Sequence, residues 1–162
     1  MKTNNKPIQA GANAPAFSWK DSSGSLRKST DLVGTTWILY FYPKDDTPGC
    51  TKEACGIRDQ WKAFEERNIP VFGCSPDSEE SHQKFKNKFD LPFELVSDTD
   101  KTIAKAYGVW GPKQFMGKSY EGVHRVTFII DPQGKVAKVF PKVKPAEHAA
   151  ELINTVDNLE TN

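Results

Sequence analysis

The sequence lacks any apolar run long enough to cross a membrane, and it carries almost no excess charge of either sign. A membrane-spanning helix needs about 20 apolar residues in succession. The 22 basic and 21 acidic residues leave a formal net charge of +1, which gives no general attraction for nucleic acid or for an anionic lipid surface. These absences argue against helical membrane spans and against nucleic acid or membrane as partners.

Cysteine and histidine are also scarce, with three of each among the 162 residues. None of them falls into the C-x-x-C or H-x-x-x-H spacing that is typical of zinc sites. The glycines form neither a GxGxxG nor a GxxxxGK phosphate loop. We therefore expect no metal site and no cofactor. We interpret Asp45 with Asp46, and Asp98 with Asp100, as solvated loop acids.

The N-terminal segment from Met1 to Pro15 is polar and has no apolar stretch. We therefore expect no secretory signal and a cytoplasmic location. In a reducing compartment three cysteines do not form a structural disulfide framework, so they are free thiols, metal ligands or redox catalysts. A chain of this length suits one domain with its own core. We expect a loose arm over residues 1–14 and one domain over residues 15–162.

Short apolar runs that alternate with amphipathic segments predict an α/β domain. The run TWILYFY at residues 36–42 is continuously apolar or aromatic, as in strands that are covered on both faces. Strands that alternate with helices imply a βαβ core, and a late hairpin makes the sheet mixed. The other predicted strands are 16–20, 25–28, 70–75, 94–97, 125–131 and 135–140, the helices are 48–68, 77–89, 100–107 and 146–159, and a glycine-rich loop is 109–123.

Cys50 lies where a helix is predicted to begin, directly after a buried strand and a short loop. Thr47 suits the N-cap, and Pro48 suits the first helical position, where a missing N–H does no harm. The unpaired N–H groups and the dipole of a first helical turn favour an anion. A thiol in this position ionises readily, and the thiolate is the nucleophile. The alternative is a small buried residue with an inert thiol.

Cys55 follows Cys50 by five residues within the same predicted helix. A five-residue step rises about 7.5 Å, which puts the two Cα atoms roughly 8–9 Å apart in an intact helix. A disulfide needs less than about 7 Å. The two cysteines therefore cannot form a disulfide while the helix is whole, and Gly49 and Gly56 make local unwinding easier.

This arrangement predicts a redox cycle. The Cys50 thiolate attacks a peroxide oxygen and becomes a sulfenic acid. The start of the helix then opens, and Cys55 condenses with the sulfenic acid to give a disulfide. An external dithiol restores both thiols by exchange. Because this disulfide is intramolecular, one chain can complete the cycle, and we expect a monomer.

The same segment resembles a known family. Pro43-x-x-x-Thr47-x-x-Cys50 is similar to the peroxiredoxin active-site motif, and the step from Cys50 to Cys55 resembles the bacterioferritin-comigratory or Q branch. The likeness extends from about Pro15 to the last helix and includes FMGKSYEGVHRVTFIID at residues 115–131. It implies a thioredoxin-like mixed sheet flanked by helices, hydroperoxide substrates and a thioredoxin-type reductant.

The resemblance also implies roles for three further residues. Thr47 would bond the thiolate and orient the peroxide, Pro43 would shield Cys50 from water, and Arg125 would stabilise the negative charge beside the sulfur. Taken alone, these residues suit a helix cap, a strand terminator and an ion-paired arginine. Glu53 either holds the arginine or favours the helix start, and we leave it outside the catalytic set.

A thioredoxin-like thiol–disulfide oxidoreductase is the main alternative. Such proteins use C-x-x-C, whereas this chain has C-x-x-x-x-C. They also resemble one another in a proline before the strand that faces the site, where this chain has Val123-His124-Arg125. Both departures favour a peroxidase. A non-enzymatic domain with incidental thiols is a third interpretation, and an ordinary reactivity of Cys50 would favour it.

Several other side chains have simpler interpretations. Cys74, in an apolar strand, is expected to be a buried free thiol. His82, on a polar helix, is expected to be exposed, and His124 gives only weak evidence of a place in the site. The apolar residues of the glycine-rich loop form either a collar around the site or loop packing, and they are Trp110, Phe115, Met116 and Tyr120.

Overall fold

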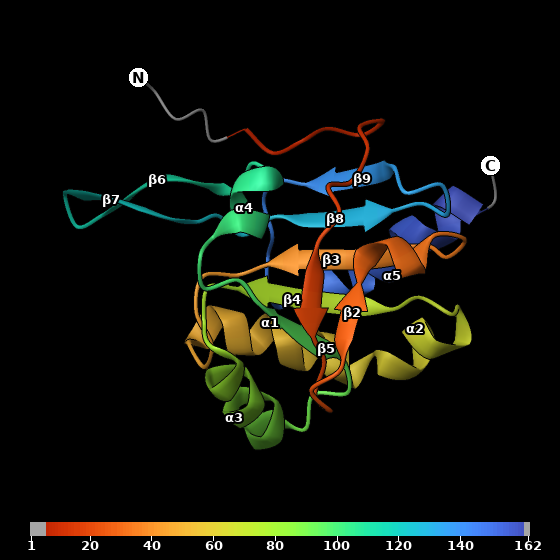
Figure 1. Ribbon diagram of the computed structural model, residues 1–162, viewed down its shortest axis with the longest axis horizontal. Helices are drawn as coiled ribbons and strands as arrows, with labels where there is room; N and C mark the ends of the chain where they lie inside the picture. The colour runs from red at the N-terminus through yellow and green to blue at the C-terminus, as the bar shows by residue number, and fades with distance from the viewer. Residues whose placement is uncertain (1–5, 161–162) are drawn as a thin grey trace.

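The computed structural model describes residues 6–160, and its centre is a mixed five-stranded sheet with the strand order β5-β4-β3-β8-β9 (Figure 1). Strands β3, β4 and β5 run parallel, whereas β8 and β9 are antiparallel to their neighbours. The predicted α/β fold with a mixed sheet is confirmed. The strands are β3 (Trp37–Phe41), β4 (Val71–Ser75), β5 (Glu94–Ser97), β8 (Thr127–Ile130) and β9 (Val136–Phe140).

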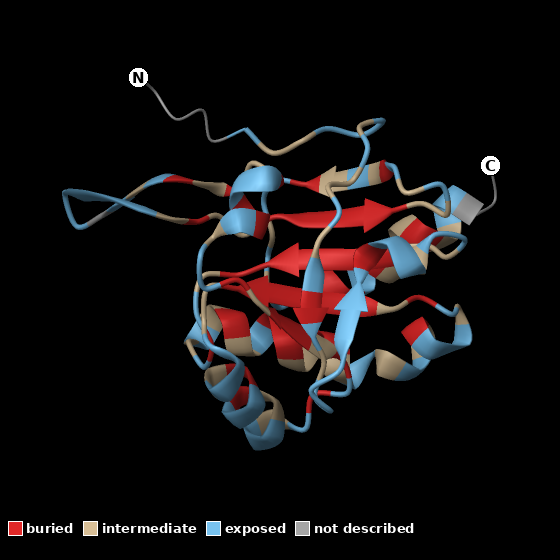
Figure 2. Ribbon diagram, viewed as in Figure 1, coloured by how far each residue is buried: buried red, intermediate tan, exposed pale blue. Residues whose placement is uncertain are grey.

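The central strand β3 is buried on both faces, as its apolar run predicts. Because successive side chains alternate, Ile38 and Tyr40 join one apolar core, and Leu39 and Phe41 join the other. Figure 2 shows the buried residues concentrated in the central sheet, while the helices turn exposed residues outward. The sheet thus separates two cores, and the one that holds Tyr40 also contains Cys50.

The helices are α1 (Pro48–Asp59), α2 (Trp61–Glu66), α3 (Glu79–Phe89), α4 (Thr102–Ala106) and α5 (His148–Glu160), with a short 3-10 helix at Ser29–Leu32. Buried residues of α1, α2, α3 and α5 belong to the core that contains Tyr40, and those of α4 belong to the other. The prediction of a single helix over residues 48–68 is wrong in one respect, because the helix is interrupted at Gln60, between α1 and α2. No described helix is long and apolar enough to cross a membrane.

Two hairpins lie outside the central sheet. The first pairs β1 (Ser18–Lys20) with β2 (Leu26–Lys28), which lie within the strands predicted at 16–20 and 25–28. The second, β6 (Trp110–Phe115) with β7 (Lys118–Val123), corrects the predicted loop at 109–123 and projects from the body of the molecule (Figure 1). Met116 and Gly117 connect its strands with φ of 52° and 80°, as a tight hairpin turn requires. Glycine and proline within the strands obscured the alternation that marks a strand in sequence.

The predicted arm, residues 1–14, is described from residue 6 onward. Backbone bonds join Ile8 to Tyr107, Gly11 to Val136 and Ala14 to Gly134, so residues 8–14 lie against the domain. The earlier part of the arm, residues 1–5, lies outside the described residues. The division of the chain at residue 15 stays a prediction.

Candidate active site

Cys50 lies in the first turn of α1, where the loop that follows β3 meets the helix. It is a free thiol with only 1% of its surface exposed, and it packs in the apolar core with Tyr40, Tyr42 and Ala54. The predicted helix start is confirmed, since Thr47 occupies the N-cap position and Pro48 begins the helix. The sulfur is thus held at the positive end of a helix in a nearly dry site.

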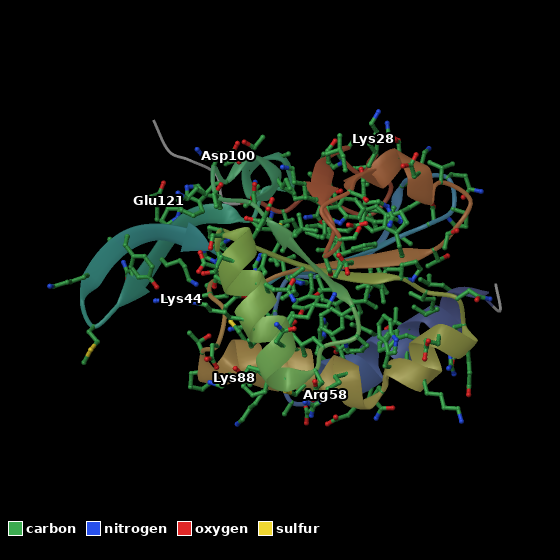
Figure 3. The ribbon with its side chains drawn as sticks, turned by 60° about the horizontal axis from the view of Figure 1, so that its bottom comes forward. Lys28, Lys44, Arg58, Lys88, Asp100 and Glu121 are labelled. Atoms are coloured by element: carbon green, nitrogen blue, oxygen red, sulfur yellow. The ribbon has the colours of Figure 1, made fainter. Side chains whose placement is uncertain are left out.

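The loop before α1 contains two of the predicted site residues, Pro43 and Thr47, and both are partly buried. Lys44, labelled in Figure 3, lies in the same loop. The Thr47 side chain does not cap α1 as expected, because its hydroxyl donates to the Lys44 carbonyl at 3.0 Å. The backbone carbonyl of Thr47 still accepts the first helical bond, from Thr51 N–H at 2.8 Å.

Arg125 lies beside the sulfur, 75 positions away in the sequence. The antiparallel register pairs Tyr40 of β3 with Thr127 of β8, so Arg125 falls just beyond the end of β3, where the chain turns toward α1. Its Nη2 donates to Cys50 Sγ at 3.3 Å. A Cβ atom on Gly49 would lie 3.1 Å from this nitrogen, so glycine leaves room for the guanidinium. Structure and motif therefore bring the same two residues together.

Glu53 completes this contact and was left outside the predicted site. Its Oε1 accepts a hydrogen bond from Arg125 Nη1 at 2.9 Å, and its side chain is fully buried. Burial lowers the pKa of Arg125, but the adjacent Cys50 and Glu53 outweigh it and raise the pKa overall. The sequence signal was the three-residue step from Cys50, which places both side chains on one helical face.

The second oxygen of Glu53 is buried, and burial changes the pKa of the whole carboxyl group. Among the described residues Oε2 has no hydrogen-bond partner, and burial raises the pKa of Glu53 to about 7 although Arg125 opposes the shift. Nearby, the hydroxyl of Tyr40 is also buried without a partner. Burial raises the pKa of Tyr40 well above its ordinary value, and Glu53 and Cys50 add to the effect. The tyrosine hydroxyl is therefore neutral.

Cys55 lies on the intact helix α1 as a free, partly buried thiol. Burial raises its pKa, and the positive charge of Arg58 opposes that shift. The two thiols on a whole helix agree with the expectation that no disulfide joins Cys50 to Cys55 in this state. Cys74 is buried on β4 as predicted, and burial raises its pKa well above the ordinary thiol value.

Two predictions about polar side chains are wrong, and both concern Asp45 and His82. Both residues are buried, and His82 Nδ1 lies within hydrogen-bond distance of Asp45 Oδ2, at 2.8 Å. Tyr42 and Ser81 donate hydroxyl bonds to the same carboxylate at 2.6 and 2.7 Å, and His82 Nε2 bonds the Val96 carbonyl at 3.0 Å. This buried network ties the loop before α1 to helix α3.

The same network contains the one group of described residues with metal-ligand geometry. Asp45, Asp77 and His82 each offer a ligand atom, and these atoms lie within 4.8 Å of one another. They are already engaged, however, since Asp77 Oδ2 accepts bonds from Asp45 N–H at 2.8 Å and from Ser75 at 2.6 Å. The contacts suit a clamp made of hydrogen bonds rather than a cation site.

Asp98 is a further correction, because it is buried rather than solvated. Its carboxylate accepts bonds from the backbone N–H groups of Ile103 and Ala104 at 3.0 and 2.8 Å, which cap helix α4. Burial raises its pKa although these two bonds oppose the shift. Its role is therefore structural.

The β6–β7 hairpin contacts the segment that carries Arg125. Lys113 Nζ donates to the Val123 carbonyl at 2.9 Å, and the His124 ring bonds the Pro112 carbonyl at 2.9 Å. His124 is thus engaged by the hairpin. Of the apolar residues proposed as a collar, Met116 is 87% exposed and Tyr120 is 49% exposed, Trp110 is partly buried, and the Phe115 side chain lies outside the described residues.

Comparison with known proteins places the chain in a family. Residues 10–139 match the model of the AhpC/TSA family. The chain is 44% identical to peroxiredoxin Bcp of Bacillus subtilis, covering 94% of this chain and 97% of the relative. It is 43% identical to peroxiredoxin Bcp of Escherichia coli strain K12, covering 91% and 95%.

Solved structures give the same picture. Peroxiredoxin Q of Xanthomonas campestris superimposes with a TM-score of 0.85 at 32% identity, covering 93% of this chain and 99% of that one. Peroxidoxin BcpB of Mycobacterium tuberculosis gives 0.81 at 33% identity, covering 93% and 97%. Fold and site thus define a thiol-dependent peroxidase with a thioredoxin-like fold, rather than the disulfide reductase that the sequence left open. The chain belongs to the AhpC/TSA family, within the Bcp and Q group of peroxiredoxins.

Proposed function

We propose that Cys50 is the residue that attacks the peroxide and that Cys55 resolves the product. The observation that supports this assignment is the 3.3 Å contact from Arg125 Nη2 to Cys50 Sγ inside a buried first helical turn. A guanidinium at this distance stabilises the thiolate and the negative charge that develops as the O–O bond breaks. The substrates are hydrogen peroxide and organic hydroperoxides.

In the first step the sulfur uses an electron pair to form an S–O bond, and the O–O bond breaks with its pair on the departing oxygen. Sulfur is oxidised by two electrons to the sulfenic acid, and the peroxide is reduced to water or an alcohol. Thr47 orients the peroxide. Because its hydroxyl donates a hydrogen bond to the Lys44 carbonyl, its oxygen is left to accept a hydrogen bond from the peroxide. Pro43 excludes water from the sulfur.

In the second step the start of α1 unwinds, and the Cys55 thiol attacks the sulfenic sulfur and displaces water. A dithiol of the thioredoxin type then reduces the disulfide by exchange. The partly buried position of Cys55 near the surface of α1 suits a thiol that meets a reductant after local unwinding. Since one chain holds both cysteines, a monomer suffices. A cytoplasmic location, where dithiol reductants are available, stays a prediction.

The assignment is tested by peroxide consumption with a thioredoxin and its reductase as electron donor. We expect Cys50→Ser to lose turnover completely and Cys55→Ser to lose turnover with thioredoxin while it still reduces one equivalent of peroxide. Cys74→Ala is the matched control, because this buried thiol has no assigned role and its loss should leave turnover intact. Normal turnover by Cys50→Ser would refute the assignment.

A further inference from the structure

Glu53 is a fully buried carboxyl group one helical turn after Cys50, and only one of its oxygens has a hydrogen-bond partner. Buried carboxylates normally have all their oxygens bonded, because an unpaired buried charge is costly. A neutral carboxyl needs less compensation. The unpartnered Oε2 is therefore evidence about the protonation of this residue, and holding Arg125 does not explain it.

A single cation connects the two acidic groups of the site. Arg125 gives Nη1 to Glu53 and Nη2 to Cys50, at 2.9 and 3.3 Å. If both were ionised, two buried negative charges would share one guanidinium. Like charges that are close together in a buried site do not ionise independently, and one of them keeps its proton.

We propose that Glu53 takes up the proton that leaves the Cys50 thiol, so that Arg125 faces one negative charge at each stage of the reaction. This inference rests on the proposed function of Cys50. Before ionisation the site holds a thiol and the Glu53 carboxylate. After ionisation it holds the thiolate and a neutral Glu53 carboxyl, and the proton has moved within the site rather than into solvent.

With this proton transfer, the electrons and the proton of the oxidation step are all accounted for. The thiolate attacks ROOH, the S–O bond forms, and RO⁻ departs with the electron pair of the broken O–O bond. Sulfur is now in a neutral sulfenic acid, so it no longer carries the negative charge that Arg125 faces. Glu53 returns to the carboxylate, and the proton that it releases converts RO⁻ to ROH. Cys50 has lost two electrons and the peroxide has gained them.

The other groups around Glu53 are poorly suited to take this proton. Tyr40 already carries a proton, because burial raises its pKa well above the ordinary value. His148 bonds Thr127 at 2.7 Å and Glu151 at 3.0 Å, and burial lowers its pKa. By contrast, burial raises the pKa of Glu53 to about 7, into the range where proton uptake is useful. The titratable and charged groups that face this centre from the packed elements are Cys50 of α1, Arg125 before β8, Lys113 of β6, His148 of α5 and, near Tyr40, Asp45.

Difference infrared spectroscopy tests the proposal, because a protonated carboxyl group has a C=O stretch that a carboxylate lacks. The sample is the reduced Cys55→Ser protein at pH 8, before and after iodoacetamide converts the Cys50 thiolate to a neutral thioether. We expect a protonated-carboxyl band that is lost on alkylation. The band should be absent from Cys50→Ser and from Glu53→Gln, and it should persist in Glu66→Gln, which alters an exposed carboxylate of α2.

A band that survives alkylation, or one that persists in Glu53→Gln, would overturn the proposal. So would a reduced protein without any protonated-carboxyl band. If Glu53→Gln does not fold, the comparison of the Cys55→Ser protein with and without Cys50→Ser still shows whether the band depends on the Cys50 thiolate. Mass measurement of the Cys55→Ser protein after one equivalent of peroxide separates the two claims. Oxygen added at Cys50 without the infrared change refutes only the role of Glu53, whereas no oxidation at Cys50 refutes the proposed function.

Discussion

Arg125 is the residue on which the electrostatics of the site depend. Its guanidinium bonds the sulfur of Cys50 and the carboxylate of Glu53 at the same time, and its side chain is only 21% exposed. The planar fork of arginine allows both contacts, which a lysine ammonium on a flexible stem cannot reproduce with the same geometry.

We expect Arg125→Ala to lower the second-order rate constant with hydrogen peroxide by about 10²–10³, the usual effect of removing one such donor. Arg125→Lys should recover only part of this loss. Stopped-flow kinetics measures the rate, and circular dichroism checks the fold. Arg27→Ala, which removes an exposed arginine of β2, is the control. An unchanged rate constant in Arg125→Ala would refute the role.

Glu53 predicts an unusual dependence of stability on pH. Its pKa in the folded chain, about 7, lies above its ordinary value of 4.5, so the folded state binds more protons between these values and stability falls as pH rises. In the Cys50→Ser background, Glu53→Gln should therefore gain about 1–3 kcal/mol at pH 8 relative to pH 4. Urea unfolding at both values measures this gain, and an equal effect at both would contradict it.

For single residues, the sequence was informative about chemistry and uninformative about burial. The positions of Cys50 and Cys55 on one helix could be predicted from local spacing, and the roles of their thiols stay a proposal. Asp45 and His82 were predicted wrongly, since their buried contact joins residues that are 37 positions apart. Such a pair leaves no local pattern.

At the scale of elements, the proposed cycle requires α1 to be stable enough to hold the thiolate and weak enough to unwind. Gly49 is needed at its position because any Cβ would crowd Arg125. Gly56 has no such constraint, since a Cβ there would meet only the Pro145 carbonyl, at an ordinary 3.8 Å. Glycine at position 56 thus weakens the helix without a steric need.

We expect Gly56→Ala to stabilise α1 by about 1 kcal/mol and to slow disulfide formation roughly fivefold, because unwinding precedes it. Formation of the sulfenic acid should keep its rate, since the first turn is unchanged, and it serves as the internal control. Quenched-flow mass spectrometry resolves the two steps. Disulfide formation at the normal rate would argue against unwinding as the limiting event.

The clamp between the loop before α1 and α3 gives another prediction. Burial raises the pKa of Asp45, but His82, Tyr42 and Ser81 outweigh it, so the pKa lies below its ordinary value. The stabilisation is therefore present above about pH 4 and is lost as pH falls below it. Asp45→Asn should cost about 1–3 kcal/mol at pH 7 and less at pH 3, as measured by urea unfolding.

The exposed neighbour Asp46 offers a matched control, because its bond to Lys88 lies at the surface. Asp46→Asn should change stability by less than about 0.5 kcal/mol. A similar loss in both variants would show that the buried pair has no special role.

Helices and strands were predictable where the apolar residues followed a single helical or strand pattern. The continuous apolar run predicted β3 directly, because that strand is covered on both faces. The amphipathic patterns predicted α3 and α5, because each of these helices packs against the core on one face only. The β6–β7 hairpin was missed, since it projects into solvent and so has no buried face to impose alternation.

At the scale of the whole molecule, sheet topology assembles the site. The strand order places β8 next to β3, so a residue in the last quarter of the chain reaches a thiol in its first third. The alternation of strands and helices predicted a mixed sheet, but the order of strands depends on contacts between distant segments. For that reason the resemblance to peroxiredoxins, and not the pattern alone, paired Arg125 with Cys50 in advance.

The central claim is that Cys50 is oxidised first and that Cys55 captures it after α1 unwinds. The most direct test is the intact mass of the reduced protein after one equivalent of hydrogen peroxide. The account predicts a wild-type product lighter by two hydrogens, with a disulfide between Cys50 and Cys55 located by peptide mapping, and a Cys55→Ser product heavier by one oxygen at Cys50. A wild-type product that retains an added oxygen with Cys55 still free would contradict it.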